Sequence, residues 1–132
     1  MLKTKCILNS KEKSDGFRIS IMSRHTLNDG ITPHPEIISG ETYEGRLKIL
    51  APPDKLIGDY YKRGLPWNEF EKQYLEYIRT PEIAEEVKDL AKDSLEETVT
   101  LLCIEESPEF CHRRLLAEEC KLYEPSLELY IR

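Results

Sequence analysis

The chain has 132 residues, the length of one ordinary domain, with 39% hydrophobic and 33% charged residues. Its 19 basic and 25 acidic residues leave a net charge of −6, which argues against attachment to nucleic acid mainly through phosphates. No apolar run approaches the ~20 residues that cross a bilayer, and residues 1–8 are too short for a signal peptide. We therefore expect one soluble cytoplasmic domain over residues 1–132, with no membrane attachment and reduced cysteines.

The first half of the chain predicts strands separated by polar segments. Residues 2–8 and 17–22 mix or alternate β-forming and polar side chains, which is typical of strands. Residues 23–45 contain turn signals and two prolines, and a loop of about twenty residues in a compact domain is usually functional or disordered. Residues 46–50 are a candidate short strand.

The second half predicts helices around one buried strand. Apolar residues recur at helical spacing over 54–63, from Pro66 to Ile78, and from Pro81 to Ala91. Residues 98–104 form the most apolar run, which favours a strand buried on both faces. The Ser107-Pro108-Glu109 cap pattern predicts a helix that continues to Tyr123, and residues 126–131 a last strand.

This alternation predicts an α/β fold, a three-layer sandwich with a largely parallel sheet flanked by helices. The connection over residues 9–16 is short for a parallel crossover, which usually takes a dozen residues or more. The first two strands therefore either pair antiparallel or lie apart in the sheet.

The candidate site is the strand–loop–helix segment 103–113, because ligands of open α/β sheets bind outside the carboxyl ends of the strands. The segment 22–30 leaves the second strand at the same kind of end and adds Arg24 and His25. A helix that begins near Ser107 offers unpaired N–H groups to an anion. At 100° per residue, His112 falls on the sheet-facing stripe of that helix, close to the end of the strand.

Each candidate residue also has a structural interpretation. His112 either moves a proton or only orients the loop, and Cys111 is either a thiol of lowered pKa or a small buried hydrophobe. Glu105 acts as an acid or base, or pairs with Arg113. Arg24 and His25 line the pocket or belong to a solvated loop. Cys103 is expected in the core.

A metal is not expected, because Cys111 and His112 have no second Cys/His pair at local spacing and structural zinc takes four ligands. No cofactor is expected either. The Trp67–Tyr77 stripe is expected to pack in the core rather than to stack on bases.

Leu101-Leu102-Cys103-Ile104-Glu105, followed by Cys111-His112-Arg113, resembles the domain of unknown function 488 family. The pattern over residues 99–120 is the specific part, and the order of elements agrees over most of the chain. The resemblance implies a compact α/β domain, a prokaryotic cytosolic protein, and marked positions at Cys103, Glu105, Cys111, His112 and Arg113. It implies no established activity. Longer members carry Asp-Val-Arg after the second strand, where this chain reads Met22-Ser23-Arg24 without the Asp.

Two hypotheses follow. In the first, a small anionic ligand, such as a phosphate or nucleotide, binds at 103–113. Its catalytic candidates are His112, Glu105 and Cys111, and its ligand-binding candidates are Arg113, Arg24, His25 and Ser107. In the second, these residues only stabilise the fold of a non-catalytic interaction module, and the 23–45 loop contacts a protein or nucleic acid. A thiol redox site at Cys111 is a lesser third hypothesis. The sequence does not indicate an oligomeric state.

Overall fold

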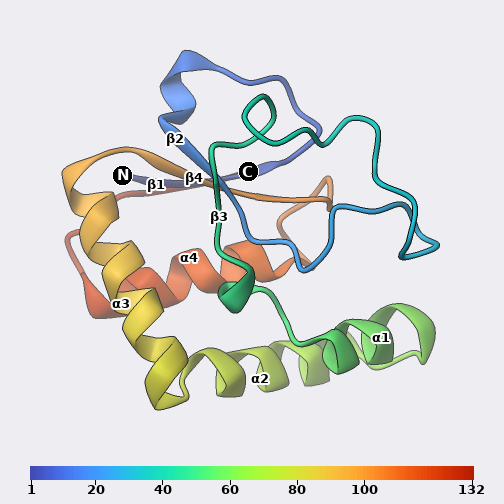
Figure 1. The fold of residues 1–132 in the computed structure, drawn as a ribbon. Coiled ribbons are helices and arrows are strands. Elements are labelled where there is room, and N and C mark those ends of the chain that lie inside the picture. Colours follow the sequence, from blue (N-terminus) through green and yellow to red (C-terminus); the bar gives the residue numbers. More distant parts are fainter.

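The computed structural model describes residues 1–132 as one five-stranded sheet with four α-helices (Figure 1). The strands are β1 (Leu2–Cys6), β2 (Phe17–Ser20), β3 (Gly45–Arg46), β4 (Val99–Cys103) and β5 (Leu129–Ile131). The helices are α1 (Asp54–Lys62), α2 (Trp67–Ile78), α3 (Pro81–Glu96) and α4 (His112–Tyr123), with short 3₁₀ turns η1 (Lys13–Asp15) and η2 (Lys48–Leu50). None of the helices combines the length and apolar character of a membrane span. The predicted α/β class is confirmed.

The sheet is entirely parallel, with strand order β3-β2-β4-β1-β5. The apolar run becomes its central strand, β4, and all five residues of β4 are buried. Both β1 and β2 pair with β4, so that Cys6 lies beside Cys103 and Ser20 beside Leu102. The two N-terminal strands therefore lie apart in the sheet, and the connection between them passes over β4, where the Thr100 hydroxyl donates to the Asp15 carbonyl oxygen.

The two faces of the sheet are covered differently. Figure 1 shows the four α-helices on one face, where 19 buried residues form the main hydrophobic core. The other face carries Lys5, Arg18 and Thr100, and it is covered by η1 and loop segments rather than by helices. The sequence analysis predicted a sheet flanked by helices. The structure has all the α-helices on one side, and loops form the second covering layer.

Several element boundaries differ from the sequence prediction. The first two strands end at Cys6 and Ser20, and most of the expected 46–50 strand is the η2 turn. The prediction that a helix begins after Ser107 is wrong, because α4 starts at His112. Residues before it form a loop, and Cys111 has an extended backbone, with φ −139° and ψ 139°.

Candidate functional site

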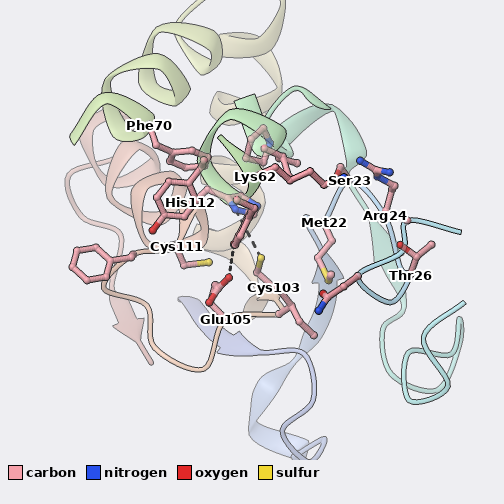
Figure 2. A pocket seen from close by; sticks show the side chains of 18 of the residues that line it. Met22, Ser23, Arg24, Thr26, Lys62, Phe70, Cys103, Glu105, Cys111 and His112 are labelled. Carbon is pink, nitrogen blue, oxygen red and sulfur yellow. Dashed lines mark hydrogen bonds between the residues drawn. The ribbon is translucent and has the colours of Figure 1, made fainter. Parts of the chain in front are cut away.

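A cavity of about 380 Å³ opens at the carboxyl ends of β2 and β4 (Figure 2). The end of β4, the first residue of α4 and the segment after β2 line it on one side, and α1 and α2 supply the other walls. This is the position that an open α/β sheet offers to a ligand, and the volume lies within the usual range for small-molecule sites.

His112 lies at the bottom of the cavity, as the helical spacing predicts. Its side chain is 8% exposed, and Nε2 lies 2.8 Å from the carbonyl oxygen of Ile21. Because a carbonyl can only accept, Nε2 carries the proton and donates this bond. The lone pair of Nδ1 is then directed at Cys103, whose Sγ is 3.8 Å away.

Cys103 is the group that the sequence analysis assigned to the core. It is the last residue of β4, and its thiol lines the cavity beside His112 (Figure 2). The Cys111 thiol, as hydrogen-bond donor, lowers the pKa of Cys103 against the opposing effect of burial. Backbone N–H groups and the Arg113 charge act in the same direction. Its place at the end of the buried strand was the signal in the sequence.

Cys111 behaves in the opposite way. Donation to Cys103 and burial raise its pKa well above the ordinary value. Of the two interpretations of Cys111, the thiol of lowered pKa is therefore wrong, because the residue caps α4 without solvent access and donates its proton to the neighbouring sulfur. If one of the two thiols is ionised, it is Cys103.

Arg113 is fully buried and does not line the cavity. Its guanidinium donates to the carbonyl oxygens of Glu105 at 2.6 Å, Glu106 at 3.3 Å and Arg132 at 3.2 Å, and lies 3.3 Å from the Sγ of Cys111. The expected pairing of Arg113 with the Glu105 carboxylate is wrong, since the bond goes to the main chain. Arg113 stabilises the 104–111 loop through these bonds, on the side of the loop that does not face the cavity.

The carboxylate of Glu105 instead accepts a hydrogen bond from the hydroxyl of Tyr61 on α1. Both residues line the cavity. Local burial of the hydroxyl and this bond raise the pKa of Tyr61. The contact joins the loop after β4 to α1 across the cavity mouth, which the sequence separation of 44 residues did not indicate.

The remaining predicted residues separate into two groups. Arg24 is exposed and lines the cavity, together with Lys62 of α1, which the sequence analysis did not select. His25 and Ser107 are not among the lining residues. His25 bonds the Ser20 hydroxyl at 2.6 Å, and burial and the Arg46 charge lower its pKa to about 4. The Ser107 hydroxyl accepts the Glu109 N–H in an exposed turn.

Aromatic side chains form much of the remaining wall. Trp67 packs against Phe70, Phe110 and Tyr60, with ring centroids 5.1, 5.6 and 5.8 Å apart. All four residues line the cavity. The helical stripe that begins at Trp67 thus packs against its neighbours, as predicted, and also presents rings to the cavity.

Comparison with family models adds a relationship over nearly the whole chain. Residues 2–123 match the model DUF488-N3a, described as "Active DUF488-N3 subclade". The chain belongs to the DUF488 family. Comparisons with curated proteins and with solved structures found no match.

In this DUF488 chain, the five marked positions of the predicted resemblance gather around one loop. Cys103, Glu105, Cys111 and His112 line the cavity, and Arg113 lies behind the loop and binds its carbonyl groups. Four of the five residues of the family pattern thus line the cavity, and the fifth stabilises the loop that carries two of them.

Proposed function

We propose that the cavity binds a small molecule with a planar ring and an anionic group, as a nucleotide has. The observation that carries this proposal is the pairing of an aromatic wall with two cations that have no carboxylate partner. The salt bridges of α1 join Asp59 to Lys55 and Arg63, and leave Lys62 free. Arg24 also forms no salt bridge.

The wall around Trp67 and Tyr60 supplies the apolar contact. Aromatic rings stack favourably on planar groups, and each stacked base is worth about 1 to 3 kcal/mol in nucleic-acid complexes. Phe110 projects into the same space from the loop before α4. A ring that enters between these side chains exchanges water for apolar contacts.

Arg24 and Lys62 lie on the same side of the cavity, away from the two cysteines (Figure 2). They supply the charge for an anionic group. This differs from the sequence hypothesis, which used Arg113, His25 and Ser107 as well. The guanidinium of Arg113 is hydrogen-bonded to main-chain oxygens and does not reach the cavity, and the other two residues do not line it. An arginine forks onto two oxygens of a phosphate or carboxylate, and a lysine adds a point charge.

The 23–44 segment bears on the choice between a ligand site and an interaction module. Part of it, from Ser23 to Gly30, forms one wall of the cavity. A loop that serves the cavity supports the ligand hypothesis over one in which the loop alone contacts a macromolecule. Ile31, which is 83% exposed, is the feature that favours the second hypothesis.

The test is calorimetric titration of the full chain with nucleoside monophosphates, the matching nucleosides and inorganic phosphate. We expect a monophosphate to bind more tightly than either of its parts, because ring and charge contact different walls. Arg24→Ala should weaken that binding about 10- to 100-fold, the effect of losing a hydrogen bond to a charged group. Lys55→Ala is the matched control on α1, because Lys55 points to Asp59 and does not line the cavity.

Two results would contradict the proposal. One is the absence of binding by every probe at millimolar concentration. The other is an Arg24→Ala variant that binds as the unaltered chain does. If Ile31→Ser abolishes association with a macromolecule while no small probe binds, the interaction module replaces the ligand site.

A further inference from the structure

Three soft donor atoms meet at the floor of the cavity. The Sγ atoms of Cys103 and Cys111 and a ring nitrogen of His112 all lie within 4.8 Å of one another, and all three residues are buried. We propose that these residues bind a thiophilic divalent cation, Zn²⁺, with one coordination position open to the cavity. This goes beyond the ligand proposal and does not depend on it.

The spacing of the donors suits zinc. Zn–S bonds of about 2.3 Å and Zn–N bonds of about 2.0 Å at a tetrahedral angle place donor atoms about 3.5 to 3.8 Å apart. The Sγ of Cys103 lies 3.8 Å from Nδ1 of His112. Small side-chain rotations are enough to bring the third donor into the same shell, because the upper limit of separation is 4.8 Å.

His112 is oriented as a metal ligand is. Metal-binding histidines usually donate their second ring N–H to a carbonyl or carboxylate, which fixes the tautomer and aims the other nitrogen at the ion. Nε2 of His112 donates to the Ile21 carbonyl at 2.8 Å, so Nδ1 is the free donor and faces the sulfurs. The imidazole would not need to turn to bind the metal.

A positive charge lies beside the two sulfurs, which lose their protons when the metal binds. The guanidinium of Arg113 lies 3.3 Å from the Sγ of Cys111 and brings a positive charge, and none of its hydrogen bonds goes to an Asp or Glu side chain. Zn²⁺ and two thiolates together are neutral, which makes a buried position tolerable. Cys6 and Cys120 have no comparable setting, since their sulfurs contact backbone carbonyls of Ile104 and Val87.

The count of donors indicates the type of site. Structural zinc sites have four protein ligands, whereas catalytic sites have three and leave one position for water or substrate. Only three donors gather here, and all three line the cavity. The open position faces the space in which a ligand would sit, so the bound ion can polarise a ligand oxygen or activate a water.

The first experiment is a zinc titration of the reduced, chelator-treated full chain against a chromophoric chelator. We expect one Zn²⁺ per chain. Replacement by Co²⁺ should give the near-ultraviolet sulfur-to-cobalt absorption and the intense visible bands of a tetrahedral site. Cys103→Ser and Cys111→Ser should each weaken zinc binding at least about 100-fold, because each removes a ligand. Cys6→Ser and Cys120→Ser are matched controls and should retain the full affinity.

A second measurement uses the unaltered chain, in case the cysteine variants fail to fold. Zinc-edge X-ray absorption should show two sulfur and one imidazole scatterer, and zinc should slow alkylation of Cys103 and Cys111 but not of Cys6 or Cys120. The proposal is overturned if no stoichiometric binding occurs, if the coordination shell lacks sulfur, or if the control variants lose as much affinity as the cluster variants. No organic ligand enters these measurements, so they are independent of nucleotide binding.

Discussion

Two buried polar clusters lie on opposite faces of β4, and they differ in how their bonding capacity is used. On the loop-covered face, the Asp15 carboxylate accepts from Lys5 at 3.1 Å, Arg18 at 2.6 Å and the Glu12 N–H at 3.0 Å. On the helix-covered face, Cys103, Cys111 and His112 keep donor atoms directed at a cavity. The first cluster has its partners within the chain, and the second has room for a guest.

The difference shows why burial and charge by themselves do not mark a functional site. Arg18 and Arg113 are among the most buried side chains, and each is bonded to groups of the fold. Arg24 is exposed and has no carboxylate partner, and it is the arginine that faces the cavity. The contrast therefore predicts that polar side chains bonded within the fold govern stability, and that polar side chains without such partners at the cavity govern binding.

The largest expected effect comes from Asp15→Asn on the loop-covered face. This change leaves Arg18 buried without a counter-charge and leaves Lys5 with only the half-exposed Glu12 carboxylate, at 3.4 Å. Breaking a buried ion pair in this way costs about 3 to 5 kcal/mol. Urea unfolding measures the loss. Glu85→Gln, which breaks an exposed pair with Lys88, is the control and should change the midpoint very little. Equal losses in the two variants would refute the structural role of the Asp15 cluster.

Arg113→Met is expected to have the next largest effect. It removes the donors to the partly buried main-chain oxygens of Glu105, Glu106 and Arg132. Such oxygens without partners cost about 1 to 3 kcal/mol each where water cannot replace the donor. The free energy of unfolding should fall by about 2 to 4 kcal/mol. Zinc and ligand binding should weaken as well, since the 104–111 loop loses its support. A variant with unchanged stability and unchanged binding would show that the 104–111 loop keeps its conformation without Arg113.

His25 tests a titratable group outside the cavity. Its pKa is about 4 in the folded chain against 6.5 when free, so between these values only the unfolded chain binds the proton. Its contribution to stability is complete above pH 6.5 and is lost as the pH falls towards 4. We expect a decrease of about 1 to 2 kcal/mol, given its partly exposed position. The urea midpoints at pH 7 and pH 4.5 should differ less in the His25→Gln variant than in the unaltered chain. If the difference is the same in both, the pH dependence of stability comes from other groups.

The smallest effect on stability is expected from Arg24→Ala. The side chain is exposed and forms no salt bridge, so the free energy of unfolding should change by no more than about 0.5 kcal/mol. Thermal and urea unfolding without ligand check this. A large destabilisation would place Arg24 among the structural arginines and remove the contrast with Arg113.

Local patterns were enough to predict most elements of the fold. The buried strand over 99–103, the three helices over 54–62, 67–78 and 81–96, and the parallel sheet all follow from apolar spacing and end signals. The start of α4 was misplaced because Ser107-Pro108-Glu109 has the residues of a cap without the tertiary support for one. Arg113, the second residue of α4, binds the main-chain oxygens of Glu105 and Glu106, so that the residues before the helix are held as a loop.

The sequence by itself determined the α/β class, the strand–loop–helix segment that bears the family pattern, and the position of His112 next to the end of the strand. These follow from periodicity and chain order, which act over a few residues. Only the tertiary structure decided that Cys103 joins Cys111 and His112, that α1 supplies Tyr61 and Lys62 to the cavity, and that Arg113 is used up by the main chain. Such relations depend on which side chains meet across the sheet and its helices, and spacing along the chain does not encode those distances.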